Sequence, residues 1–133
     1  MNELKRNFFY SKSASAKTVR KNCFWVEVNG NKYLVSYQTI VCCISASGYF
    51  HRFWDDYSVT TLNQIRQFIS LFEVFNNVTG EKLTGFNKKE WLDYPVERPI
   101  EDDEKQIVPL IPAIEWTNYG YSGYDYAKRI IYS

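Results

Sequence analysis

The sequence predicts an α+β fold: an antiparallel meander of three or four strands covered by one amphipathic helix, with a second short helix and extended termini. Residues 23–28 are rich in aromatic and β-branched side chains, which favour strands. The Asn29-Gly30 pair that follows is typical of a two-residue hairpin turn. Between residues 62 and 75, large apolar side chains recur at three- and four-residue steps, as on one face of a helix.

The meander is expected to contain three long strands. The first covers residues 23–28, and the second covers residues 32–44, where apolar side chains fall on both faces. Residues 45–48 form a turn, and residues 49–54, with the sequence YFHRFW, form the third strand. Because both faces of the second strand are partly apolar, we expect the helix to cover one face and a tail or partner to cover the other.

The covering helix has a marked start. Thr61 and Gln64 have the spacing of a capping box, and Ser58 and Thr60 are alternative N-caps. Asn76-Asn77 and then Gly80 are expected to end the helix. The apolar side chains expected to pack on the meander are Leu62, Ile65, Phe68, Ile69, Phe72 and Phe75.

A second, shorter helix is expected near residues 88–92, because Asn87 and Glu90 also have the spacing of a capping box. Pro95 prevents its continuation, and three further prolines predict that the acidic segment after it is extended. The chain is therefore expected to have three parts: a basic, partly mobile lead-in at residues 1–22, a compact core at residues 23–94, and a last part at residues 95–133. This last part combines a Pro-rich acidic segment with a Tyr-rich tail that packs on or extends from the core.

Residue types that carry chemistry are few. The sequence contains no phosphate-binding glycine loop, no HExxH motif and no CxxC pair. Cys42 or Cys43 could pair with His51 on a neighbouring strand as nucleophile and base, but a buried, inert cysteine is the commoner case. Asp55 and Asp56 could bind a divalent cation, although turn and strand-ending roles are commoner for aspartate. The sequence therefore predicts no catalytic residue, no metal site and no cofactor.

Charge and cysteine content indicate the setting. The formal net charge is +1, which gives no strong field toward nucleic acids or membranes. The chain has three cysteines and no recognisable secretion signal, which predicts free thiols in a reducing cytoplasm. No apolar run approaches the ~20 residues that cross a bilayer, so no membrane association is expected.

Surplus aromatic residues and segregated charge favour a binding role. Aromatic residues make up 18% of the chain, more than a small core needs, and exposed rings are typical of binding surfaces. The residues predicted to contact a protein partner are Asp102, Asp103, Glu104, Tyr119, Tyr121, Tyr124 and Tyr126. In an alternative interpretation, the phosphates of a nucleic acid would bind to Lys12, Lys17, Arg20, Lys21, Lys128 and Arg129.

A family resemblance covers residues 33–92. It rests on the strand YLVSYQTIV, the segment FHRFWDDYSVTTLNQIRQF and a Lys-Lys-Glu-Trp sequence near position 90. The best-matching residues are Ser36, Tyr37, Trp54, Tyr57, Ser58, Thr60, Thr61, Ile65, Phe68 and Trp91. This pattern resembles small uncharacterised proteins carried by phages, plasmids and integrated elements of Gram-positive bacteria. The resemblance implies a genomic setting and no specific activity.

These observations predict a non-enzymatic accessory protein of a mobile element that binds a host or competitor macromolecular machine. An anti-CRISPR-type inhibitor of an RNA-guided nuclease is one member of this class. The alternative is a nucleic-acid-binding accessory protein for replication or transfer of the element.

Overall fold

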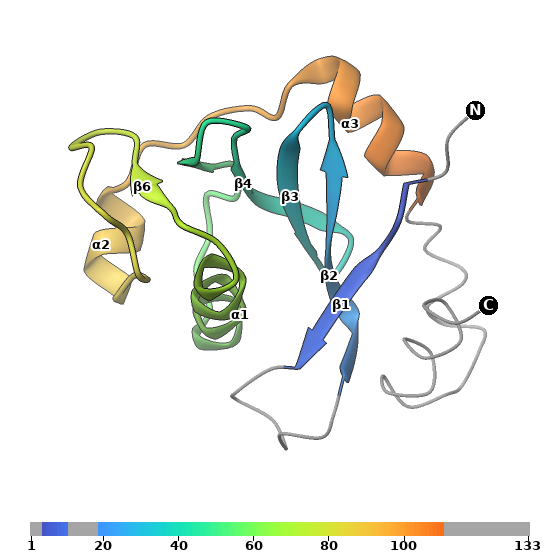
Figure 1. Cartoon of the computed structure of the whole chain (residues 1–133). Helices are drawn as coiled ribbons and strands as arrows, with labels where there is room; N and C mark the ends of the chain where they lie inside the picture. Colours follow the sequence, from blue (N-terminus) through green and yellow to red (C-terminus); the bar gives the residue numbers. More distant parts are fainter. Residues whose placement is uncertain (1–3, 11–18, 111–133) are drawn as a thin grey trace.

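The computed structural model describes residues 4–10 and 19–110. The strands are β1 (Asn7–Tyr10), β2 (Val19–Val28), β3 (Asn31–Ser36), β4 (Thr39–Ile44), β5 (Tyr49–Arg52) and β6 (Phe75–Asn76). The helices are α1 (Val59–Ser70), α2 (Lys88–Asp93), α3 (Glu101–Ile107) and a 3₁₀ turn, η1 (Val108–Leu110) (Figure 1). In this described part of the chain, no helix has the length and apolar character needed to span a bilayer.

The strands form one sheet in which spatial order follows the sequence from β1 to β6. Neighbouring strands are antiparallel from β1 to β5, while β6 is parallel to β5. The predicted α+β class, with an antiparallel meander covered by a helix, is therefore confirmed. The sheet is wider than expected, because β1 extends one edge and the two-residue β6 extends the other.

The single long strand predicted at residues 32–44 was wrong, because the chain turns back at Tyr37 and Gln38. These residues separate β3 from β4 and have φ values of 50° and 68°. Positive φ at both central residues is what a type I′ hairpin turn requires, and Asn and Gly usually supply it. The predicted turn at Asn29-Gly30 follows the same rule, with φ values of 53° and 85°, and is confirmed.

Helix α1 is the predicted covering helix, but it begins and ends at other residues than the sequence predicted. Ser58 is its N-cap, and the Ser58 Oγ accepts a hydrogen bond of 3.0 Å from the Thr61 amide. The capping residue is therefore the alternative Ser58 rather than Thr61. The helix ends at Ser70, so the predicted continuation to Asn76 was wrong, and Phe75 lies in a strand.

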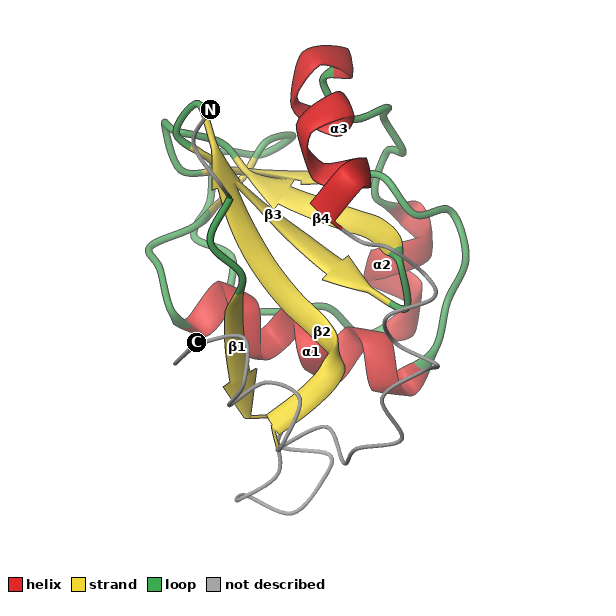
Figure 2. Cartoon of the chain, turned by 90° about the vertical axis from the view of Figure 1, so that its right-hand side faces the viewer, coloured by secondary structure: helices red, strands yellow, loops and turns green. Residues whose placement is uncertain are grey.

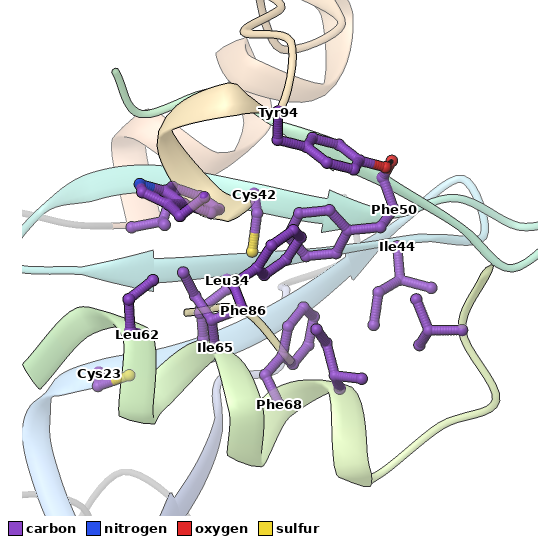
Figure 3. Close-up of a cluster of buried hydrophobic side chains, with 14 residues drawn as sticks. Cys23, Leu34, Cys42, Ile44, Phe50, Leu62, Ile65, Phe68, Phe86 and Tyr94 are labelled. Carbon is purple, nitrogen blue, oxygen red and sulfur yellow. Dashed lines mark hydrogen bonds between the residues drawn. The ribbon is translucent and has the colours of Figure 1, made fainter. Parts of the chain in front are cut away.

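A first core lies between the sheet and α1. The helix contributes four of the six predicted apolar side chains as buried residues: Leu62, Ile65, Phe68 and Ile69. They pack in one cluster with Leu34, Cys42, Ile44 and Phe50 of the sheet and with Phe86, Trp91 and Tyr94 around α2 (Figure 3). Burial of each large side chain contributes about 2 kcal/mol, so this cluster is the main source of stability.

Helix α2 begins with the predicted capping box. The Glu90 amide donates to Asn87 Oδ1 at 2.8 Å, and the Asn87 amide donates to Glu90 Oε1 at 2.9 Å. These two bonds satisfy amides that have no partner within the helix. They place Trp91, which is fully buried, against Phe86, with the ring centroids 5.3 Å apart.

A second core lies on the other face of the sheet, beneath α3. Tyr33 and Cys43 point to this face, and Leu34 points to the α1 side, as the alternation along a strand requires. Figure 2 shows α3 over the strands on the side away from α1. The extended conformation predicted after Pro95 was wrong for residues 101–107, where Asp103 and Ile107, one turn apart, give the helix a buried face.

Candidate functional site

Side chains that could take part in chemistry gather on the sheet face that carries α3. This face is called the α3 face below. Cys43 of β4 lies opposite Tyr33 of β3 and also opposite His51 of β5. Residues opposite one another in antiparallel strands point to the same face, so the phenol, thiol and imidazole form one row across the sheet. A carboxylate is bound at each end of this row: Asp103 at Tyr33 and Glu97 at His51.

Asp103 fastens α3 to the hairpin between β2 and β3. Its carboxylate accepts hydrogen bonds from Tyr33 Oη at 2.6 Å, Asn29 Nδ2 at 2.9 Å and Asn31 Nδ2 at 3.1 Å. Asp103 is only 1% exposed. A buried carboxylate is costly unless hydrogen bonds replace its water shell, and here three side-chain donors do so. The network therefore fixes the position of α3 on the sheet.

The thiols and the phenol near this network are held in their protonated forms. Burial raises the pKa of Tyr33 well above its usual value, and donation to Asp103 raises it further. Burial also raises the pKa of the Cys43 thiol to about 12, with a contribution from the charge of Asp103. Cys42 faces the other core, and burial raises its pKa as well. Since only a thiolate is a good nucleophile, neither thiol is activated at neutral pH.

His51 belongs to a separate network at the edge of the sheet. Its Nδ1 lies 2.8 Å from Glu97 Oε2, which also accepts a bond of 3.2 Å from Asn77 Nδ2. Asn77 Oδ1 in turn accepts a bond of 2.8 Å from Tyr94 Oη. Asn77 Nδ2 also lies 3.1 Å from His51 Nδ1, so the carboxylate and the amide converge on one ring nitrogen. No described residue hydrogen-bonds to the other ring nitrogen, Nε2.

The structure thus brings together the Cys43–His51 pair that the sequence suggested as nucleophile and base. The imidazole of His51 is oriented by Glu97, however, while Cys43 is 3% exposed and interacts with Tyr33. An activated nucleophile needs a base within hydrogen-bond reach. The observed interactions of this pair instead serve to hold β4, β5 and the segment around Glu97 together.

Arg52 has a structural role that the sequence did not reveal. Its side chain lies on the α1 side of the sheet, and the residue is 2% exposed. It donates to the carbonyl oxygens of Trp54 at 2.8 Å, Trp91 at 2.7 Å and Tyr94 at 2.9 Å, and it lies 4.5 Å from the centre of the Trp91 ring. Burial lowers the pKa of Arg52. These bonds satisfy carbonyl groups at the C-terminal end of α2 and fasten that helix to β5.

The outward surface of α3 is acidic and is flanked by exposed apolar side chains. Glu101, Asp102 and Glu104 are exposed. Lys105 Nζ lies 3.3 Å from Glu101 Oε1, which leaves Asp102 and Glu104 without a salt bridge from any described residue. The apolar residues at the two ends of α3, Ile100 and Val108, are also exposed.

A strip of side chains along β5 completes the α3 face. Tyr49 and His51 alternate along β5 and point to the same side, and Phe53, directly after the strand, packs on the same face. Phe53 stacks on Tyr33 with ring centroids 5.9 Å apart, and it is half-buried. Tyr49 is 42% exposed, and its ring contacts Phe75 of β6 at 6.3 Å between centroids. The strip thus offers aromatic surface beside the imidazole.

The predicted acidic contact residues differ in their exposure to solvent. Asp102 and Glu104 are exposed on α3, as a contact role requires, whereas Asp103 is buried and bound to three side chains. The proposal that Asp103 contacts a partner is therefore corrected to a structural role. Consecutive residues of a helix point in directions about 100° apart, so with Asp103 facing the sheet its neighbours Asp102 and Glu104 point away from it.

Most of the other predicted contact residues lie outside the described residues. These are Tyr119, Tyr121, Tyr124 and Tyr126 of the protein-binding prediction, and Lys12, Lys17, Lys128 and Arg129 of the nucleic-acid alternative. Arg20 and Lys21 lie in β2, but their side chains are outside the described part. Asp55 and Asp56 are exposed, and among the described residues no group of three or more His, Cys, Asp or Glu side chains could hold a metal ion.

Sequence reasoning missed both carboxylate networks. Asn29 and Asn31 flank the hairpin glycine and indicated only a turn, although their amides bind Asp103. His51 and Glu97 are 46 positions apart, and nothing in the sequence links them.

One comparison with known proteins gave a match. Residues 5–91 match a family of unknown function, DUF8033. This match spans more than half of the 133 residues and ends at Trp91 of α2, so Glu97 and α3 lie beyond it. No curated protein and no solved structure matches the chain.

Proposed function

We propose that this chain, which belongs to the DUF8033 family, is a non-enzymatic protein that binds a macromolecular partner through its α3 face. The contact surface would combine the outward side of α3 with the strip along β5. Its free carboxylates, Asp102 and Glu104, suit a basic surface of the partner.

The observation that carries this proposal is the anchoring of α3. A helix of seven residues is only marginally stable by itself in water. Here Asp103 and Ile107 fix its inner side on the sheet, so Asp102 and Glu104 on its outer side are held in defined positions. A surface that is already ordered loses less conformational entropy when it binds a partner.

The state of the reactive side chains also supports a binding role over catalysis. The thiols of Cys42 and Cys43 are buried and have raised pKa values. His51 binds Glu97, and Asp103 binds the hairpin. His51 and Asp103 thus link secondary-structure elements, whereas the exposed carboxylates of Asp102 and Glu104 form no such link to any described residue.

The resemblance of residues 33–92 to proteins of mobile elements indicates which partners to test first. Small proteins in that setting often occupy a surface of a host or competitor machine. An RNA-guided nuclease is the first candidate, since its nucleic-acid channel is strongly basic.

A capture experiment with charge-reversal variants tests this function. Tagged chain would be incubated with a purified RNA-guided nuclease and, separately, with lysate of a natural host. The test variant carries Asp102→Lys and Glu104→Lys. A matched control carries Glu73→Lys and Asp93→Lys, two exposed carboxylates outside α3. The wild type and the control should retain the same partner, and the test variant should lose it. No partner, or equal capture by all three proteins, would contradict the proposal.

A gel-shift titration addresses the nucleic-acid alternative. Binding through phosphates must weaken steeply as salt concentration rises. A salt-sensitive shift together with no protein capture would favour that alternative over the α3 face.

A further inference from the structure

The tip of the hairpin between β2 and β3 lies beside α3 and is formed by Asn29 and Gly30, the single Asn-Gly pair of the chain (Figure 1). Asn29 is exposed and Gly30 is half-buried, so water reaches the turn. The Gly30 amide donates no hydrogen bond to any described residue. Glycine has no side chain to hinder an approach to its nitrogen, and its backbone is the least restricted of all residues.

Other asparagines of the described chain lack this combination. Asn76 is followed by Asn77, whose amide donates to Tyr94 Oη at 2.9 Å. Asn77 is followed by Val78, whose amide donates to Asn76 Oδ1 at 2.7 Å. In both cases the next residue carries a side chain and its amide is held by a hydrogen bond. The Asn29-Gly30 pair is therefore the place where a backbone nitrogen can most easily reach an asparagine side chain.

The side chain of Asn29 also holds α3. Its Nδ2 donates to Asp103 Oδ1 at 2.9 Å, and the buried carboxylate receives its other side-chain bonds from Tyr33 and Asn31. An amide can donate, whereas an ionised carboxylate in its place can only accept. A carboxylate at position 29 would face the charge of Asp103, and like charges repel more strongly where little water separates them. Loss of the Asn29 amide therefore weakens the attachment of α3.

We propose that Asn29-Gly30 is a self-modification site whose deamidation irreversibly loosens α3 from the sheet. Asparagine is among the chemically labile residues of proteins. The Gly30 nitrogen bonds to Asn29 Cγ, the Cγ–Nδ2 bond breaks, and Nδ2 leaves as ammonia with the proton of the Gly30 amide. Water then opens the succinimide ring, adding OH to one of its carbonyl carbons and H to the nitrogen.

The products are aspartate, or isoaspartate in which the main chain runs through Cγ. Both products lack the amide that donates to Asp103. Isoaspartate also lengthens the main chain of a tight turn, which disturbs the pairing of Val28 with Asn31. A loosened α3 would no longer hold Asp102 and Glu104 in defined positions. Deamidation would then end partner binding through the α3 face, and this last consequence alone rests on the proposed function.

Ageing the folded protein at mildly alkaline pH in heavy-oxygen water tests the reaction. Peptide mass spectrometry should find the Asn29 peptide converted to products that contain the heavy oxygen, while the peptides with Asn76 and Asn77 stay unchanged. A sample unfolded in guanidinium chloride gives the rate for an unprotected pair. Because loop tips open at little cost, the folded protein should react at no less than about one tenth of that rate. A slower reaction would show that the hairpin protects the pair and would overturn the proposal.

Hydrogen exchange tests the consequence for α3. Asn29→Asp supplies the aspartate product in uniform form, and the amides of residues 101–107 should exchange at least about tenfold faster in it than in the wild type. The matched control is Asn87→Asp, whose carboxylate still accepts from the Glu90 amide, and exchange at residues 101–107 should not change.

The aged wild-type protein gives a second measurement. Its deamidated fraction, separated by the added negative charge on an anion-exchange column, should show the same faster exchange in α3. Unchanged exchange in Asn29→Asp or in the aged fraction would overturn the proposal. Neither measurement uses a partner, so failure of the capture experiment would reject only the proposed function, and failure here would reject only the deamidation site.

Discussion

Tyr33 Oη and Asp103 Oδ2 are joined by a hydrogen bond of 2.6 Å between residues 70 positions apart. The phenol belongs to the sheet within the family match, and the carboxylate belongs to a helix beyond it. The bond is buried and charge-assisted, and bonds of this kind contribute more than neutral ones. Together with the bonds from Asn29 and Asn31 and the burial of Ile107, it holds α3 on the sheet.

Replacing Asp103 by alanine should destabilise the protein by about 3 kcal/mol. The substitution leaves the buried Tyr33 hydroxyl without its acceptor and removes the bonds to Asn29 and Asn31. Urea unfolding measures the loss, and hydrogen exchange of the amides at residues 101–107 should accelerate. The neighbouring Asp102→Ala is the control and should change stability by less than about 0.5 kcal/mol. Equal effects of the two substitutions would mean that Asp103 does not anchor α3.

Stability should fall on the alkaline side of pH ~8.5 because of the buried thiols. An unfolded cysteine loses its proton near that pH, whereas the pKa of Cys43 in the folded protein is about 12. Between these values the folded state holds more protons, so raising the pH favours unfolding by about 1.4 kcal/mol per pH unit for each such group. Tyr33, whose pKa is also raised, adds to the loss above pH ~10.

Urea unfolding at several pH values from about 7.5 to 10.5 measures this slope. Cys43→Ala should lower the slope by about one proton, while its effect at neutral pH should reflect only lost packing. A stability that stays flat up to about pH 10 would show that the thiol ionises in the folded state.

The elements that could be predicted are those with local signals. Asn29-Gly30 marks a turn through its own backbone preferences, and the Asn87–Glu90 spacing marks a helix start. The stripe that includes Ile65 and Phe68 marks a helix face. In each case the residues that determine the structure are neighbours along the chain, so a sequence pattern contains the whole cause.

The elements that could not be predicted depend on distant contacts. Helix α3 has seven residues, four of which are acidic, and its buried side is defined only by Asp103 and Ile107 meeting the sheet. The His51–Glu97 pair forms because the segment after α2 returns along the edge of β5. No periodicity or turn preference in the sequence predicts that this segment returns to β5. The candidate site could therefore be found only from the structure.

Replacing Arg52 by lysine should cost about 2 kcal/mol, although the charge is kept. A single ammonium group cannot reproduce the forked donation to the carbonyls of Trp54, Trp91 and Tyr94. The unfilled carbonyls at the end of α2 would remain buried. Unfolding monitored by tryptophan fluorescence measures the change. Arg66→Lys, at an exposed position of α1, should be nearly neutral, and similar costs for both substitutions would contradict the helix-fastening role of Arg52.

The double substitution Tyr37→Asn and Gln38→Gly, in the turn between β3 and β4, should stabilise the protein. Both native residues hold a left-handed conformation that costs about 1 kcal/mol each, whereas Asn tolerates it and Gly adopts it freely. Gly also adds entropy to the unfolded chain, so the net gain should be about 1 kcal/mol, seen as a rise in Tm of about 3–5 °C. Tyr37 is 58% exposed and contributes little to the cores.

Gly30→Ala is the reverse control, in the turn between β2 and β3. The φ of Gly30 is 85°, and the new Cβ would lie 3.0 Å from Ala46 Cβ, so Tm should fall. If the double substitution lowered Tm instead, the strained tyrosine would have to make a stabilising contact that outweighs its backbone cost.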